Sequence, residues 1–272
     1  MDRRSTPFSG RVAHGSLQGM VEAESYTDGT PARIARPLAD LNRSPGGARD
    51  RQVIWGERVR VIDRRDGHAY VMADKDGYCG WIAEGALGPD HPVTHRVGSL
   101  FSQLYPEPRV QARETMHLPF GAQVQVLSVG GKFVETPQGF VPLAHLRPLN
   151  DPEDDPVAVV ERFLGVPYLW GCNSAAGLDC SGLVQAAMVA CAIPCPGDSD
   201  QQAAAGEDVA ERDLAPGDLV FWKGHVAMIS APDEIIHATA AFMAVVREPL
   251  HTAVSRILAQ GGGPVTHRRR LR

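Results

Sequence analysis

A cysteine lies between an aspartate and a serine where a helix is expected to begin. The segment AAGLDCSGLVQAAMVAC covers residues 175–191, and from Cys180 onward its apolar residues recur at helical spacing. Asp179 is a good N-cap residue, which places the Cys180 thiol in the first turn, at the positive end of the helix dipole. One interpretation is a nucleophile, because that position stabilises a thiolate. The other is a buried core cysteine, a common fate for this residue type.

A nucleophilic thiolate needs a base, and the base needs a group that orients it. His225 begins an expected strand with an apolar continuation, and His237 lies inside the next expected strand, after two isoleucines. A hairpin centred on Ala231 would set the two histidines directly opposite one another. Such a pair is hard to explain by packing, so we predict a base and its orienting partner. The alternative is a pair of buried structural histidines.

A metal site is the main rival interpretation of the cysteines in the second half of the chain. Seven, ten and three residues separate them, and no C-x-x-C pair of the kind usual in structural zinc sites is present. The glycine-rich segments lack the spacing of a phosphate-binding loop. We therefore expect no metal and no nucleotide cofactor. The cysteines concerned are Cys172, Cys180, Cys191 and Cys195.

The elements that carry these residues predict an α+β domain, with helices first and an antiparallel meander after them. A helix is expected to open at Asp155-Pro156 and to stop at Gly165. The Cys180 helix and a short helix follow before the strands. Beyond the Cys180 helix we expect a helix at 199–205, strands at 219–222, 225–230, 234–240 and 244–250, and a helix at 250–259.

The first 150 residues or so are predicted to be all-β, because short alternating runs are separated by turn signals. An internal repeat, GERVRVI at 56–62 and GAQVQVL at 121–127, indicates two small barrels. An acidic, proline-containing linker, LNDPEDDP, follows them. The predicted order is an N-terminal arm packed on the first barrel (1–29), a first barrel (30–90), a second barrel (91–149), the α+β domain (150–260) and a solvated basic tail (261–272).

The composition is that of an ordinary soluble globular protein, with 43% hydrophobic and 22% charged residues among 272. A net charge of −5 disfavours nucleic acid as the main partner. Five cysteines, an odd number, do not suggest a secreted disulfide framework. The first residues contain no apolar core of signal-peptide length, and no apolar run is long enough to span a membrane. We expect a cytoplasmic protein.

Three segments resemble the NlpC/p60 family of bacterial cell-wall cysteine peptidases. They are PYLWGCNSAAGLDCSGLVQ (167–185), PGDLVFWKGHVAMI (216–229) and IIHA (235–238). The barrels resemble bacterial SH3 domains, and the combination, with PGDSDQ at 196–201, is similar to the γ-D-glutamyl-L-diamino acid endopeptidases. The resemblance implies an α+β fold with a papain-like catalytic domain preceded by two small all-β SH3-like barrels.

The resemblance also implies roles for individual residues. Cys180 is the nucleophile, His225 the general base and later the acid, and His237 the residue that orients His225. Tyr168 lies beside the nucleophile and reaches the oxyanion, together with the backbone N–H of Cys180. The remaining matches line the substrate groove (Asp179 and Ser181) or hold the free amino end of an L-Ala-γ-D-Glu unit (Asp198 and Ser199).

The first barrel offers two further candidates. Where it has Glu57 and Tyr78, the second barrel has Ala122 and Phe140. In the relatives, the first SH3 domain covers the substrate site with a glutamate and a tyrosine, so the resemblance implies this role for Glu57 and Tyr78. The alternatives are a surface glutamate and a half-buried barrel tyrosine.

One position departs from the family pattern. The family usually has Trp-Gly-Gly where this chain has Trp170-Gly171-Cys172. A larger residue there would narrow the site if its φ were positive. The change does not touch the three catalytic positions, so it bears on specificity more than on activity.

The resemblance implies hydrolysis of the γ-D-glutamyl-diamino acid bond of free murein peptides. The substrate would be L-Ala-γ-D-Glu-diaminopimelate with a free N-terminal L-Ala, and the product L-Ala-D-Glu, as in the recycling of cell-wall peptides. Two alternatives remain open: a non-catalytic module that binds wall peptides, and an acyltransferase that uses the same thioester. The sequence separates neither diaminopimelate from lysine nor one oligomeric state from another.

Overall fold

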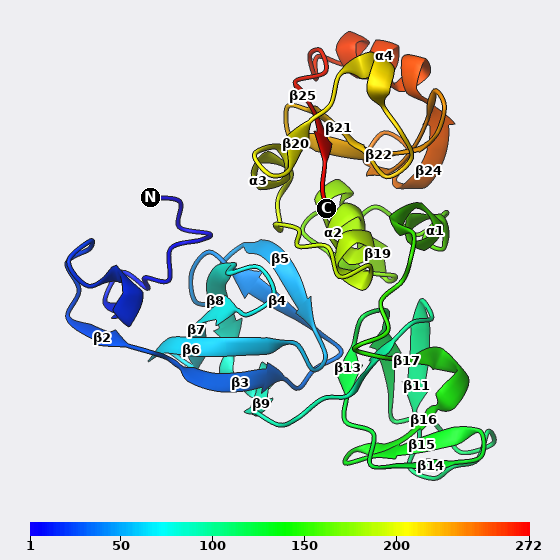
Figure 1. Ribbon diagram of the computed structural model, residues 1–272. Coiled ribbons are helices and arrows are strands. Elements are labelled where there is room, and N and C mark those ends of the chain that lie inside the picture. The colour runs from blue at the N-terminus through cyan, green and yellow to red at the C-terminus, as the bar shows by residue number, and fades with distance from the viewer. The chain divides into compact units, whose positions relative to one another are not determined.

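The computed structural model describes all 272 residues, which form two compact units, Met1–Leu149 and Asn150–Arg272 (Figure 1). The N-terminal unit contains strands and single-turn 3₁₀ helices. The C-terminal unit combines four α-helices with a six-stranded sheet. The expected α+β class with an all-β N-terminal region is confirmed.

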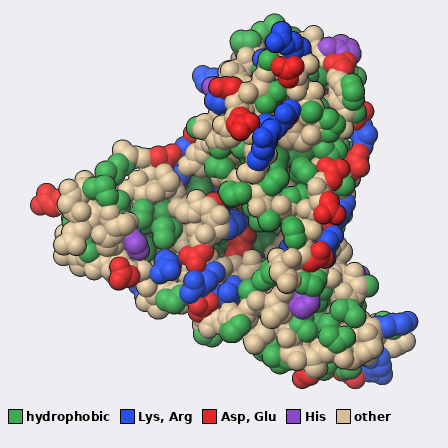
Figure 2. Space-filling view, in the orientation of Figure 1, with side chains coloured by type: hydrophobic (Ala, Val, Ile, Leu, Met, Phe, Trp, Pro, Cys, Tyr) green, Lys and Arg blue, Asp and Glu red, His purple; other side chains and the backbone are tan.

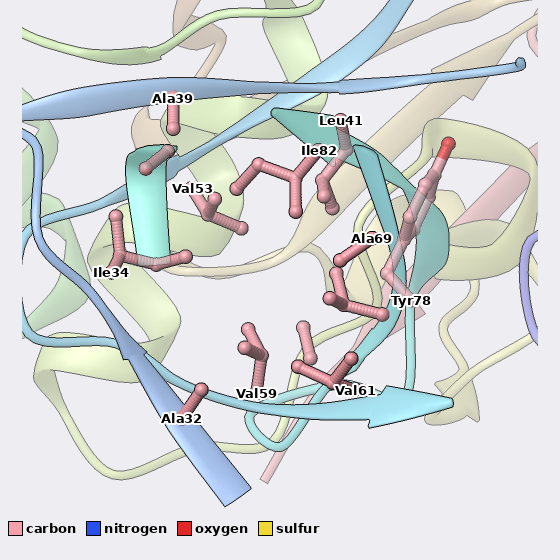
Figure 3. Packing of buried hydrophobic residues seen from close by; sticks show 13 residues of the cluster. Ala32, Ile34, Ala39, Leu41, Val53, Val59, Val61, Ala69, Tyr78 and Ile82 are labelled. Carbon is pink, nitrogen blue, oxygen red and sulfur yellow. The ribbon is translucent and has the colours of Figure 1, made fainter. Parts of the chain in front are cut away.

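The first barrel is a seven-stranded sheet in the order β5-β4-β8-β7-β6-β3-β9. Alternate side chains of β6, such as Val59 and Val61, point into a cluster of buried residues (Figure 3). The β6–β7 hairpin turns at Asp66 and Gly67, both with positive φ, which suits the twist of two-residue hairpins. The strands are β3 (Thr30–Ile34), β4 (Leu38–Asn42), β5 (Arg49–Ile54), β6 (Arg58–Arg65), β7 (His68–Ala73), β8 (Cys79–Ala83) and β9 (Leu87–Pro89).

The N-terminal arm packs on this barrel, as expected. The carbonyl of Arg4 accepts from the N–H of Cys79, and the hydroxyl of Tyr70 donates to the carbonyl of Thr6. Val12 covers the aromatic cluster around Tyr70. The arm contains the parallel pair β1 (Val12–His14) and β2 (Ser25–Thr27), with a 3₁₀ turn at Gly15–Leu17.

The remaining strands of the N-terminal unit form three small sheets, β13-β10-β17, β11-β12 and β14-β15-β16. Their shared core includes Val97, Leu118 and Val141, and Trp55 of the first barrel packs into it. The strands are β10 (His95–Val97), β11 (Phe101–Leu104), β12 (Met116–Pro119), β13 (Gln123–Val124), β14 (Ser128–Gly130), β15 (Phe133–Thr136), β16 (Gly139–Pro142) and β17 (Leu146–Pro148).

The sequence repeat corresponds to a repeated backbone arrangement. Ile34 exchanges hydrogen bonds with the backbone of Gly56 and Glu57, and Val97 does the same with Gly121 and Ala122. Both glycines have positive φ, +78° and +82°. A left-handed conformation favours glycine, so this residue recurs at the head of both copies.

The C-terminal unit is built on a sheet in the order β20-β25-β21-β22-β23-β24. Helices α2 and α4 lie on opposite sides of it (Figure 1), and α4 packs Ala253 and Ile257 against Val220, Ala227 and Ile229. The strands are β20 (Glu207–Asp208), β21 (Leu219–Trp222), β22 (His225–Ala231), β23 (Glu234–Thr239), β24 (Ala244–Pro249) and β25 (His267–Arg270). The helices are α1 (Pro156–Glu161), α2 (Cys180–Ala190), α3 (Ser199–Ala203) and α4 (Leu250–Ala259). A small hairpin, β18 (Asn173–Ser174) and β19 (Gly177–Leu178), precedes α2.

The expected register of the histidine hairpin was wrong. Met228 pairs with Ile236 and Ile229 with Ile235, and a bulge between Ile229 and Ala231 shifts the pairing. Continued along the strands, this register brings Ala227, not His225, opposite His237. A bulge adds one residue to one strand, and symmetric counting from a turn does not anticipate it.

The expectation of a solvated tail at residues 261–272 was also wrong. The last strand, β25, lies between β20 and β21. The Arg270 guanidinium donates to both carboxylate oxygens of Asp218 at 2.6 and 2.7 Å, and Asp218 is only 1% exposed. Arginine-rich composition suggests solvent exposure, but it does not reveal a carboxylate elsewhere in the chain that pairs with one arginine.

The surface shown in Figure 2 carries acidic and basic side chains that are interspersed rather than gathered by sign. Arg58 illustrates this, since it lies between Asp74 and Asp90. None of the helices has the length and apolar character that crossing a membrane requires.

The β25 ion pair generates a stability prediction. Replacing Arg270 (Arg270→Met) leaves the buried Asp218 carboxylate without its bidentate partner, so the midpoint of urea denaturation falls. Arg272→Met is the matched control, because Arg272 and Glu207 are 3.7 Å apart and both mostly exposed. Equal midpoints for the two variants would contradict a structural role for Arg270.

Candidate active site

The start of α2 is fixed by Asp179, the predicted N-cap. One of its oxygens accepts from the N–H of Gly182 at 2.7 Å, and the other accepts from the N–H of Gly171 at 2.8 Å. Gly182 packs so closely on the preceding loop that an added Cβ would lie 2.5 Å from the carbonyl oxygen of Cys172. These contacts hold Cys180 in the first turn of the helix, as predicted.

The Cys180 thiol is buried, with 7% of the residue exposed. Backbone N–H groups of Val226, Ser181 and Cys180 itself point at the sulfur and lower its pKa. Burial, followed by the negative charge of Asp179, outweighs them and raises the pKa of the thiol to about 12. The helix start favours the thiolate as expected, and burial opposes it more strongly.

His225 and His237 are in direct contact despite the shifted register. Nε2 of His225 lies 2.8 Å from Nδ1 of His237, which identifies the pair that the sequence predicted. His237 is 1% exposed, and His225 is partly buried at the start of β22. Burial lowers the pKa of each to about 3; the neighbouring His237 adds to the effect at His225, and Arg256 adds to it at both. Both rings are neutral near pH 7.

A carboxylate that the sequence did not single out lies behind this pair. Oε1 of Glu248, on β24, is 3.0 Å from Nε2 of His237, and Arg256 of α4 forms an ion pair with the same carboxylate. Glu248 is only 8% exposed. The strand alternation of 244–249 gave a partial signal for a buried glutamate, but its meeting with His237 depends on the β23–β24 register.

Tyr168, Asp179 and Ser181 surround the nucleophile. Burial is the main cause that raises the pKa of Tyr168 to about 12, and the charge of Asp179 also raises it, so the hydroxyl remains a hydrogen-bond donor. The Ser181 hydroxyl donates to Asp179 at 3.2 Å. The Asp179 carboxylate is thus committed to the backbone and to Ser181, which makes it a structural support of the site.

Asp198 and Ser199 begin α3, and Gln202 in the same helix ties them to the nucleophile. The side-chain amide of the fully buried Gln202 donates to the carbonyl of Ser181 at 3.0 Å and to that of Pro196 at 2.9 Å. The structure therefore brings the PGDS segment beside the first turn of α2. The sequence prediction did not include Gln202, because a glutamine in a short helix carries no signal of its own.

The comparisons with known proteins agree with this geometry. Residues 165–256 match the model of the NlpC/P60 family, and residues 41–87 match that of the bacterial dipeptidyl-peptidase Sh3 domain. The chain carries an NlpC/P60 domain and a bacterial SH3 domain. It is a cysteine peptidase, so a non-catalytic binding module is excluded. That residues 91–149 form a second SH3 domain stays a prediction.

Two relatives resemble most of the chain. A γ-D-glutamyl-L-lysine dipeptidyl-peptidase of Bacillus cereus is 27% identical over 74% of this chain and 70% of its own length. The enzyme of the same name from Bacillus subtilis is 28% identical over 69% and 71%. The crystal structure of an NlpC/P60 family protein from Bacillus cereus superposes with a TM-score of 0.77 at 22% identity, covering 89% of this chain and 99% of that one.

Cys172, the departure from the family's glycine pattern, fits the NlpC/P60 domain without backbone strain. Its φ is not positive, its side chain is buried, and its carbonyl accepts from the N–H of Asp179 at 3.2 Å. None of the five cysteines forms a disulfide, and no group of three or more His, Cys, Asp or Glu side chains is arranged to hold a metal ion.

Glu57 and Tyr78 belong to the N-terminal unit, and both are buried there. The Glu57 carboxylate accepts from Lys75 and from the N–H of Ile54, so it is not the surface residue of the alternative interpretation. The Tyr78 ring lies in the first-barrel core with the Arg51 guanidinium 4.9 Å away, and its hydroxyl points out of the cluster (Figure 3). A substrate contact of either residue stays a prediction.

The resting protonation states predict how the thiol responds to pH. With the pKa of Cys180 raised to about 12 and that of His225 lowered to about 3, no thiolate–imidazolium pair exists between these values. The rate of inactivation by iodoacetamide should therefore rise continuously with pH, because the reactive thiolate grows tenfold per pH unit below its pKa. Cys180→Ala shows which alkylation belongs to the site. A rate plateau extending below about pH 6 would reveal a preformed ion pair and contradict this expectation.

Proposed function

We propose that this enzyme hydrolyses the γ-D-glutamyl bond to the diamino acid of free murein peptides and releases L-Ala-D-Glu. The observation that carries the proposal is the link from the nucleophile helix to the Asp198–Ser199 segment through Gln202. This link joins the segment to the first turn of α2, and a carboxylate and a hydroxyl are a pair suited to bind a free amino group. The names of the two Bacillus relatives support the same bond class.

The reaction begins from a neutral pair. As the Cys180 sulfur attacks the γ-carbonyl carbon, Nδ1 of His225 takes the thiol proton, since Nε2 of that ring is occupied by His237. The tetrahedral oxyanion is stabilised by the backbone N–H of Cys180 at the helix start and by the Tyr168 hydroxyl. His225 then protonates the leaving amine of the diamino acid, the thioester forms, and a water activated by the same ring hydrolyses it.

Burial of the thiol and of the imidazole determines when the two groups become charged. The two groups are neutral at rest because the protein interior disfavours both charges. As the sulfur attacks, the imidazolium and the substrate's oxyanion form together. The negative charge of the oxyanion then compensates the positive charge of the imidazolium. The charged pair thus arises in the transition state, which is where an enzyme gains from stabilising it.

Selectivity for a free N-terminus follows from the chemistry of Asp198. An ammonium group forms a charge-assisted hydrogen bond with the Asp198 carboxylate, whereas an acylated nitrogen carries no charge and adds bulk. A hydrogen bond to a charged group contributes about 1.5–3 kcal/mol, and the acylated substrate loses this contribution. Glycan-linked stems, whose alanine nitrogen is acylated, are then poor substrates, and peptides already released from the wall are good ones.

The proposal also covers the cellular compartment of the enzyme and the identity of the diamino acid in its substrate. Five cysteines without a disulfide suit a reducing compartment, and we place the enzyme in the cytoplasm, where it would act in recycling of murein peptides. We propose diaminopimelate as the diamino acid. Both relatives are named for lysine, so lysine is the comparison that the assay must include.

The first assay compares four peptides by mass spectrometry. They are L-Ala-γ-D-Glu linked to diaminopimelate or to lysine, each with a free or an acetylated N-terminus. We expect cleavage of the free diaminopimelate peptide alone, and none by Cys180→Ala. Cleavage of acetylated peptides would contradict the role of the free amine. Transfer of the dipeptide to an added amine acceptor, in preference to water, would identify an acyltransferase.

A pair of variants in α3 tests the amine contact itself. Asp198→Asn removes the charge that binds the ammonium group, so KM for the free peptide should rise about tenfold to a hundredfold. Asp200→Asn is the matched control, because Asp200 is exposed, lies two residues further on in the first turn of α3 and has the same charge as Asp198. Similar KM values for the two variants would show that Asp198 does not bind the amine.

A further inference from the structure

We propose that Glu248 is a positioning residue that fixes the tautomers of His237 and His225, and thereby makes Nδ1 of His225 the base that receives the Cys180 proton. The proposal rests on the cysteine-peptidase activity and does not depend on which peptide is the substrate. The chain of contacts runs from Arg256 to Glu248, His237 and His225.

The sheet places these side chains on one face. Glu248 of β24 is paired with Ile235 of β23, and His237 lies two residues beyond Ile235, on the same side of the strand. Ile235 belongs to the cluster covered by α4, which also supplies Arg256. Backbone pairing, rather than loop conformation, therefore sets the separation of the Glu248 carboxylate and the His237 ring.

The Nε2 atom of His237 has one available acceptor. Oε1 of Glu248 is 3.0 Å away, and no other atom forms a hydrogen bond with this buried nitrogen. This pair meets the distance of a hydrogen bond but not its angle. An ionised carboxylate only accepts hydrogen bonds, so Nε2 of His237 must carry the proton of the neutral ring.

The tautomer of His237 then determines that of His225. With its proton on Nε2, His237 presents a bare Nδ1, and the 2.8 Å contact requires His225 to donate from its own Nε2. The proton of neutral His225 is thereby on Nε2, and its Nδ1 is a lone pair. In the inverted tautomers, Nδ1 of His225 would already carry a hydrogen and could not take the thiol proton.

Arg256 holds the Glu248 carboxylate as the hydrogen-bond acceptor that this role requires. Its guanidinium binds the Glu248 carboxylate and lies 5.1 Å from the centre of the Phe242 ring. The guanidinium donates to Oε1 of Glu248, the same oxygen that lies nearest Nε2 of His237, so this oxygen acts as an acceptor for both side chains. Burial and Arg256 keep His237 neutral, so the carboxylate acts by orienting a neutral ring.

The competing explanation is that Glu248 only attaches α4 to the sheet through Arg256. Glu153 provides a matched control in the same unit, because it is 7% exposed and forms two hydrogen bonds with Arg162, at 3.0 and 2.8 Å. Glu153→Gln removes a similar buried carboxylate–arginine pair without touching either histidine. If Glu248→Gln changes kcat or the histidine spectrum more than the control does, the additional change results from the lost contact with His237.

The decisive measurement is a long-range ¹H–¹⁵N spectrum of the histidine rings in the full chain, assigned with His225→Asn and His237→Asn. In the wild-type protein near pH 7 we expect both rings in the Nε2–H form. An Nδ1–H form of either ring would overturn the proposal. This readout needs no substrate, so it stands even if the enzyme cleaves none of the murein peptides.

Kinetics provide the second readout, with whichever peptide the wild type cleaves. We expect Glu248→Gln to lower kcat at least about tenfold with little change in KM, because part of the population adopts the inverted tautomers. Glu153→Gln should keep the wild-type kcat and histidine spectrum. Glu248→Asp should recover part of the loss. A wild-type kcat and spectrum in Glu248→Gln would overturn the proposal.

Discussion

The carboxylate of Asp179 is the contact on which the geometry of the site depends. Its two oxygens bind the first turn of α2 and the backbone of Gly171, so one side chain fixes both the helix start and the loop before it. Gly182 permits the close packing that this requires. The position of the thiol at the start of α2 and that of the loop at Gly171 therefore depend on the same carboxylate. Loss of the cap would displace all of them together.

Burial determines how this site operates. The thiol and the two imidazoles sit where charge is unfavourable, so the protein holds them as neutral partners. A preformed ion pair would be reactive at rest, and exposure of the thiolate would invite alkylation and oxidation. A neutral pair becomes reactive when a substrate arrives whose developing charge it can balance. Helix position alone does not reveal this, since the backbone N–H groups favour the thiolate that burial opposes.

The N-terminal unit shows how a repeat can keep its backbone and change its side chains. The positive-φ glycines Gly56 and Gly121 preserve the same hydrogen bonds in both copies, whereas the following residue is glutamate in one and alanine in the other. Glu57 uses its carboxylate to bind Lys75 and the Ile54 backbone. The difference between the copies thus has a structural consequence within the first barrel.

The sequence by itself determined the four helices and the four central strands of the C-terminal unit, the cap at Asp179 and the contact between His225 and His237. These follow from local signals, such as a capping residue, an apolar period or a turn, that act within a few residues. The tertiary structure decided the rest: the hairpin bulge, the place of β25 in the sheet, and the meeting of Glu248 with His237. Each of these depends on pairing between segments that are distant in the chain. The protonation of Cys180 depends on its burial by such segments. A local sequence pattern contains neither the long-range pairing nor the burial, because both arise only when the chain has packed.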